Sequence, residues 1–203
     1  MLKRYLYTWS FLIATFLVAG SLTAQPIVYK VQLNENSTMT IDGTSTIHDW
    51  TSTVEEVDGT LKLDQKTVNK GLKKGDKFEE LNINIPVKKI ISPRGSSMDN
   101  RTWDALKVET NPQIIFNLKN AEVTGKNDEG LTINASGDLT IAGVTKPVTL
   151  EAIGKEEAEG VRFAGSKTFK MTEYEVDPPS AMFGQIKTGD EVTINFNLLF
   201  AKQ

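Results

Sequence analysis

The sequence predicts an all-β protein, an antiparallel barrel of about eight or more strands with one short helix. Three observations lead to this prediction. Apolar and polar residues alternate with period two in many segments, turn residues separate these segments at regular distances, and one segment alone has helical spacing. Because successive side chains on a strand point to opposite faces, each alternating segment is a strand with one buried and one wetted face.

The alternating segments divide the chain into ten expected strands. They lie at 27–33, 37–42, 46–54, 58–64, 78–89, 113–124, 130–142, 146–154, 160–170 and 190–201. The last strand is the clearest, because Val192, Ile194 and Phe196 alternate with Thr193 and Asn195. Glycine-containing turn signals lie at 58–59, 74–76, 127–130, 142–143, 159–160 and 188–190. Closing so many strands into a barrel leaves few exposed strand edges.

One helix is expected at 96–108. Serine or aspartate can cap its start, and Met98, Trp103 and Leu106 form an apolar stripe along it. The helix ends before Asn111-Pro112, because the residue that precedes a proline avoids helical conformation.

The N-terminal 1–24 has the pattern of a secretory signal peptide. Two basic residues precede a short apolar run, and small residues follow it. The alternative is a membrane anchor, but the run is shorter than the roughly 20 apolar residues that a spanning helix needs. We expect cleavage after Ala24 or after Ser21. The remaining 25–203 is then a single barrel domain, soluble, mildly acidic, not membrane-spanning, and periplasmic or secreted.

Composition excludes several kinds of chemistry. The chain has no cysteine and one histidine, which excludes thiol catalysis, disulfides, cysteine-based metal centres and sites built from several histidines. The formal net charge of -3 provides no basic surface for nucleic acid. No glycine-rich phosphate loop and no calcium-loop spacing is present in the sequence. We therefore expect no cofactor, no metal and no nucleic-acid partner.

Ser45, His48 and Asp49 are the residue types of a nucleophilic triad. On the strand expected at 46–54, however, His48 and Asp49 project to opposite faces, so the carboxylate cannot orient the imidazole. We expect no catalytic residue and regard His48 as an ordinary strand residue.

The predicted barrel interior mixes bulky and small side chains. Phe116, Phe163 and Phe196 share the inward registers with Ala135 and Ala152. Barrels of eight strands are either filled by side chains or enclose one ligand, so this pattern leaves a packed core and a ligand cavity equally open.

Residues 137–150 read Gly-Asp-Leu-Thr-Ile-Ala-Gly-Val-Thr-Lys-Pro-Val-Thr-Leu, which resembles the signature of the YceI-like family. The segments 81–87, 163–166 and 189–194 occur in the order that the family shows, and the resemblance covers nearly all of 37–202. It implies a lipocalin-like barrel in the periplasm, whose elongated apolar lumen binds a polyisoprenoid or a related long-chain lipid.

The resulting hypothesis is an exported, noncatalytic binding protein that encloses such a lipid in its lumen. The expected lining residues are Trp103 and Leu106 from the helix, with Phe116, Ile133, Leu139, Ile141, Val148, Phe163, Ile194 and Phe196 from the strands.

The alternative hypothesis is a structural or interaction protein. Its barrel would be packed, and the loop at 177–184, with Met182 and Phe183 beyond two prolines, would bind a partner protein.

Overall fold

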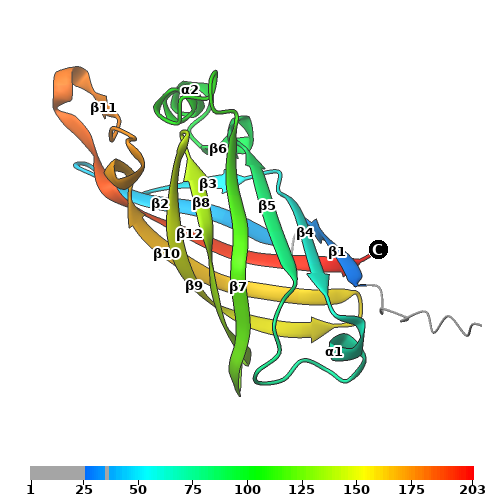
Figure 1. Cartoon of the computed structure of the whole chain (residues 1–203). Coiled ribbons are helices and arrows are strands. Elements are labelled where there is room, and N and C mark those ends of the chain that lie inside the picture. Colours follow the sequence, from blue (N-terminus) through cyan, green and yellow to red (C-terminus); the bar gives the residue numbers. More distant parts are fainter. Residues whose placement is uncertain (1–25, 35–36) are drawn as a thin grey trace, which may run out of the picture.

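The computed structural model describes residues 26–34 and 37–203. Eight antiparallel strands form a closed barrel (Figure 1). They are β1 (Ile27–Gln32), β4 (Asp58–Leu63), β5 (Glu80–Pro86), β7 (Gln113–Asn127), β8 (Gly130–Ile141), β9 (Val144–Glu157), β10 (Gly160–Lys170) and β12 (Ile186–Lys202), each paired with the next, and β12 pairs back to β1. The predicted fold class is confirmed. The predicted signal peptide lies outside the described residues.

The long strand β12 changes partners along its length. Its C-terminal part pairs with β1, whereas Thr188 to Asn197 pair with β2 (Thr38–Ser45). Strand β2 continues into β3 (Trp50–Val54), and β3 pairs with β6 (Ile90–Ile91). The wall of one end of the barrel is therefore extended by three strands that the other end lacks.

The predicted helix is present as α2 (Ser96–Ala105), which ends a few residues earlier than expected. Lys107 adopts a left-handed conformation with φ of 55° and so stops the helix before Pro112. A second, one-turn helix, α1 (Gln65–Asn69), was not predicted; the Asp64 carboxylate caps it by accepting from the Thr67 amide at 2.9 Å. Figure 1 places α2 and α1 at opposite ends of the barrel.

The strand predicted at 46–54 is wrong in its first part. Strand β2 runs on to Ser45, and His48 and Asp49 lie in the turn before β3. The Ser45 hydroxyl builds this turn, because it donates to the His48 carbonyl at 2.7 Å and accepts from the His48 amide at 3.2 Å. Local side-chain hydrogen bonds of this kind compete with strand pairing.

Short helical turns interrupt the other connections. They are η1 (Val87–Lys89) between β5 and β6, η2 (Met171–Tyr174) after β10, and η3 (Met182–Gly184) after β11 (Ser180–Ala181). Strand β11 pairs with the start of β12 and forms a hairpin with it, which projects from the α2 end of the barrel (Figure 1).

Several of the most deeply buried core residues lie toward the α1 end of the barrel. Leu61, Leu63 and Val123 are completely buried there. The ring of Phe163 lies between those of Phe78 and Phe200, with both centroid distances 5.6 Å. These aromatic rings pack against one another across the interior near the α1 end. In the described part of the chain, no helix is long and apolar enough to cross a membrane.

We predict that Leu61→Ala lowers the free energy of unfolding by about 2–5 kcal/mol, because it opens a void in the core. Urea unfolding measures this loss. Lys62→Ala is the matched control on the outward face; its exposed ion pair with Glu80, at 2.6 Å, contributes less than about 1 kcal/mol. If the two variants lost the same free energy of unfolding, this would contradict the assignment of Leu61 to the inward face and Lys62 to the outward face of β4.

Candidate functional site

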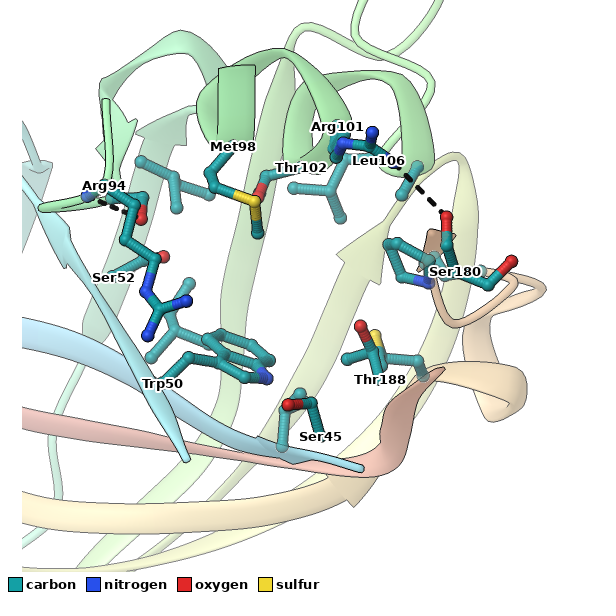
Figure 2. Close-up of a pocket in the computed structure, with 18 of the residues that line it drawn as sticks. Ser45, Trp50, Ser52, Arg94, Met98, Arg101, Thr102, Leu106, Ser180 and Thr188 are labelled. Atoms are coloured by element: carbon teal, nitrogen blue, oxygen red, sulfur yellow. Dashed lines mark hydrogen bonds between the residues drawn. The ribbon is translucent and has the colours of Figure 1, made fainter. Parts of the chain in front are cut away.

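An outer cavity of about 340 Å³ lies at the α2 end of the barrel. Its size is at the lower end of the range for small-molecule sites. Met98, Thr102 and Leu106 point into it from α2, opposite Trp50 and Thr188 (Figure 2). Other apolar lining residues come from β2, β6, β7, β8, β10 and β12; they are Ile41, Ile90, Ile114, Ile141, Phe169, Val192 and Ile194.

An inner cavity of about 130 Å³ lies deeper in the barrel. Aliphatic and aromatic side chains line it; among them are Met39, Leu81, Ile83, Ile85, Phe116, Ile133, Leu139, Val148, Leu150, Phe163, Phe196 and Leu198. Among the described residues that line this cavity, Lys167 alone is charged. The inner cavity therefore offers almost exclusively apolar surface.

Ile114 of β7 and Ile194 of β12 line both cavities. Lys167 is the partner of Ile194 in the pairing of β10 with β12, so it sits at the same level. We call this narrowing, formed by Ile114, Ile194 and Lys167, the waist. The two cavities are thus successive parts of one elongated lumen, with the waist between them.

The lumen stays open because its phenylalanine rings lie against glycines of the wall. The ring of Phe116 covers Gly137, where a Cβ atom would approach it to 2.7 Å, and that of Phe196 covers Gly165 at 2.8 Å. A larger residue at either glycine would clash with the ring and, more closely still, with the backbone carbonyl of Asn117 or Glu151. Bulky and small residues together therefore leave central space in the barrel, which the two cavities occupy.

The mouth of the outer cavity is polar and cationic. The hydroxyl groups that line this cavity belong to Ser45, Ser52, Ser92, Ser97, Thr102, Tyr174, Ser180 and Thr188. Arg94 and Arg101 add two guanidinium groups, and no aspartate or glutamate occurs among the described residues that line either cavity. The lining is thus free of acids although the chain carries a net charge of -3.

Three hydrogen-bonded connections link the elements around the mouth. Arg94, just before α2, contacts His48 Nε2 in the β2–β3 turn. Arg101 of α2 donates to the Ser180 carbonyl of the β11 hairpin at 3.2 Å (Figure 2). The Thr46 amide of the β2–β3 turn donates to the Lys187 carbonyl of the same hairpin at 3.0 Å. Helix, turn and hairpin are therefore each joined to the other two.

The contacts of His48 are those of a structural residue. Its Nδ1 lies 3.0 Å from the Asp49 carbonyl oxygen, so Nδ1 carries the hydrogen and Nε2 accepts from Arg94. The Ser45 hydroxyl donates to the His48 carbonyl and not to the imidazole. The His48 ring thus connects the β2–β3 turn to Arg94 at the mouth. Neither Ser45 nor Asp49 contacts the ring with its side chain as a catalytic triad requires.

Buried aromatic side chains support the mouth from η2. Tyr174 is 1 % exposed and its ring meets that of Phe169 edge-on at 5.2 Å. Burial, and secondarily the charge of Glu173, raise the pKa of the Tyr174 phenol, so it is neutral at physiological pH.

Asp190 of β12 fastens η2 to the barrel. Its carboxylate accepts from the Thr172 amide at 2.9 Å and from the Thr172 hydroxyl at 2.7 Å. These hydrogen bonds, that of the amide foremost, lower the pKa of Asp190. In the part of the chain that the structure describes, no group of three or more acidic or histidine side chains could hold a metal ion.

Nine of the ten predicted lining residues lie on the lumen. Leu106 and Ile141 line the outer cavity, Ile194 lines both, and six line the inner cavity, namely Phe116, Ile133, Leu139, Val148, Phe163 and Phe196. Trp103 is not among the described lining residues. Its indole packs on the core from α2 and donates to the Ile90 carbonyl at 3.1 Å, so it holds the helix in place.

Sequence reasoning missed the residues of the mouth. Arg94 lies just before the predicted helix, and Arg101 lies within it. Trp50 follows the turn that contains His48. None carries a local motif, because segments far apart in the chain bring them together. Only the excess of serine and threonine in these segments could have indicated a polar opening.

The fold and the lumen define a closed antiparallel barrel with a largely apolar interior. The model of the YceI-like domain matches residues 29–200. The chain belongs to the YceI-like family. No curated protein sequence matches it.

Solved structures of low sequence identity share the fold. BcnA of Burkholderia cenocepacia is 19% identical with a TM-score of 0.59, over 80% of this chain and 94% of that one. A polyisoprenoid binding domain from Saccharophagus degradans, implicated in plant cell wall breakdown, is 14% identical with a TM-score of 0.60, over 87% and 99%. The Campylobacter jejuni YCEI protein is 18% identical with a TM-score of 0.56, over 75% and 84%.

We predict that Asp190→Asn destabilises the protein in a pH-dependent way. Because the folded-state pKa of Asp190 is lowered, its contribution to stability is present above the unfolded value of about 4 and is lost as the pH falls through the folded value. Urea unfolding of both proteins from pH 7 to pH 3 should show a difference that shrinks in acid. Asp128→Asn, in the exposed β7–β8 turn, is the control. A difference that grows in acid would contradict this assignment.

Proposed function

We propose that the protein is an exported, noncatalytic carrier that encloses a polyisoprenoid or a similar long-chain lipid in its lumen. The observation that carries this proposal is the inner cavity, where Lys167 is the one charged group among the described lining residues. An apolar chain that enters through the outer cavity first passes the polar groups of the mouth and then meets largely apolar surface, which Lys167 interrupts at the waist. The polyisoprenoid binding domain from Saccharophagus degradans, which shares the fold, supports the same ligand class.

Burial of the chain supplies enough free energy for this function. Each buried methylene contributes about 0.8 kcal/mol. About ten to fifteen buried carbon groups then contribute roughly 8–12 kcal/mol, which is comparable with the 4–15 kcal/mol that association costs. Tight binding therefore requires a long chain, and few polar contacts are needed. The residues that we propose as ligand contacts are the nine predicted residues on the lumen, with Trp103 as the residue that positions α2.

The alternative of a packed barrel receives less support. Two cavities of about 340 and 130 Å³ occupy the space that a packed core would fill. The arrangement of Ser45, His48 and Asp49 likewise gives no support to a hydrolase.

Export is the second part of the proposal, and residues 1–24 carry it. We expect the mature protein to begin at Gln25 or Leu22 and to be found in the periplasm or the medium. N-terminal sequencing of the protein from fractionated cells tests this, and a cytoplasmic protein that retains Met1 would contradict it.

We predict that Ala152→Phe empties the lumen of lipid. Ala152 lines the inner cavity, and a phenyl ring there occupies the space of the ligand chain. Native mass spectrometry of the protein purified from its own host should show a lipid adduct on the wild type and at least tenfold less on the variant. Ala158→Phe, in the exposed β9–β10 turn, is the matched control.

Circular dichroism checks that Ala152→Phe is folded, and Ala152→Leu provides a milder filling of the same space. A folded variant that carries as much lipid as the wild type would refute binding in the inner cavity. A wild type without lipid would refute the proposed function.

A further inference from the structure

We propose that the open end of the barrel docks onto the surface of a lipid membrane, with three apolar side chains inserted around the mouth. This inference rests on the proposed function and names the place where the carrier takes up its lipid. Among the described residues, the exposed large hydrophobic side chains are Ile47, Met98 and Phe183, with exposed fractions of 61%, 36% and 110%.

All three of these side chains belong to the open end. Ile47 lies in the β2–β3 turn, Met98 on α2 and Phe183 at the tip of the β11 hairpin. Figure 1 places α2 and this hairpin together at one end of the barrel, and the Thr46 hydrogen bond joins the turn to the hairpin. Exposed apolar groups gathered at one site mark an interaction surface.

The apolar surface of the rim is continuous with the lumen. Ile47 and Met98 also line the outer cavity, so their side chains face both solvent and the interior. A lipid chain that moves from a bilayer into the lumen along them stays in apolar contact. This matters because each methylene that crosses water costs about 0.8 kcal/mol. The continuity favours a bilayer over a protein partner, which would cover the mouth without supplying a chain.

Phe183 is presented by its backbone. It adopts a left-handed conformation with φ of 57°, which is rare for a bulky residue, and Gly184 follows with φ of 85°. These angles form the tight tip that directs the ring into solvent. Strain at an exposed aromatic residue points to a role outside the fold. Aromatic rings are favoured at the boundary between water and hydrocarbon.

The rim is held as one platform. The Arg94–His48, Arg101–Ser180 and Thr46–Lys187 contacts join the helix, the turn and the hairpin, which are the segments that carry the three apolar side chains. Arg94 and Arg101 also place positive charge at the mouth. Anionic lipid headgroups attract such groups by about 1 kcal/mol each near the surface, whereas the acidic protein as a whole would be repelled.

Vesicle flotation tests the proposal. The wild type is incubated with vesicles of phosphatidylcholine, alone or with one third phosphatidylglycerol. We expect a membrane-bound fraction that is several-fold larger on the anionic vesicles and that falls as salt is added. Phe183→Ser should reduce the bound fraction about fivefold or more, and the triple variant Ile47→Ser, Met98→Ser, Phe183→Ser should abolish it.

Phe183→Trp serves as the conservative variant. It should keep vesicle binding and show a blue shift of tryptophan fluorescence, beyond that of the wild type, when vesicles are added. Ala158→Phe, which adds an aromatic ring at the other end of the barrel, should leave vesicle binding unchanged.

Lipid uptake separates this inference from the proposed function. A fluorescent long-chain lipid is offered either in vesicles or from detergent. Phe183→Ser should slow uptake from vesicles about fivefold or more and leave the affinity for detergent-delivered lipid unchanged, because Phe183 is not among the residues that line the lumen. A wild type that takes up lipid from detergent but ignores vesicles, or a Phe183→Ser protein that binds vesicles like the wild type, would overturn membrane docking. A folded wild-type protein that takes up no lipid from detergent would refute the proposed carrier function. It would not by itself refute membrane docking, which vesicle flotation tests separately.

Discussion

The structure depends on the pairing of β12, the strand that closes the barrel. Along one side it pairs with β10, and along the other it pairs first with β2 and then with β1. Backbone groups of a strand have to be paired, so this exchange of partners determines how many strands surround each end. Where β12 pairs with β1, the strands form a tightly paired wall, and the rings of Phe163 and Phe200 pack together inside it. Where β2 follows, β3 and β6 extend the wall, and the outer cavity opens inside it.

The width of the lumen follows from which side chains lie against the wall. Glycines beneath Phe116 and Phe196 let these rings lie back, and the space that remains is lined by aliphatic groups. At the waist, Lys167 interrupts this lining. A lysine can contribute its methylenes to an apolar wall while its ammonium group turns toward water or a polar group. The waist is therefore the level at which a bound chain meets its one charged neighbour among the described residues of the inner cavity.

Alternation along the chain was sufficient to predict the barrel and most of its strands, because burial of one strand face is a local signal. It failed at 46–49, where the Ser45 hydroxyl forms a turn within a segment that reads as a strand, and at α1, which is too short to show helical spacing. Eight of the nine lumen residues were predictable from the strands, because alternate side chains of a strand face inward. The helical stripe predicted Leu106 correctly but not Trp103, since such a stripe does not reveal whether a side chain meets the cavity or the core.

The mouth lies beyond sequence reasoning for a different physical reason. Its connections join residues 46, 48, 94, 101, 180 and 187, which lie far apart in the chain and are brought together by the pairing of β12 with β2 and of β3 with β6. The same closure turns Ile47 and Met98 into residues of both the rim and the cavity. Exposed apolar side chains reduce solubility, so their restriction to the open end among the described residues is informative. One constraint, the closure by β12, thus produces a tightly paired end, a largely apolar interior, and an entrance where exposed apolar side chains lie among hydroxyl and guanidinium groups.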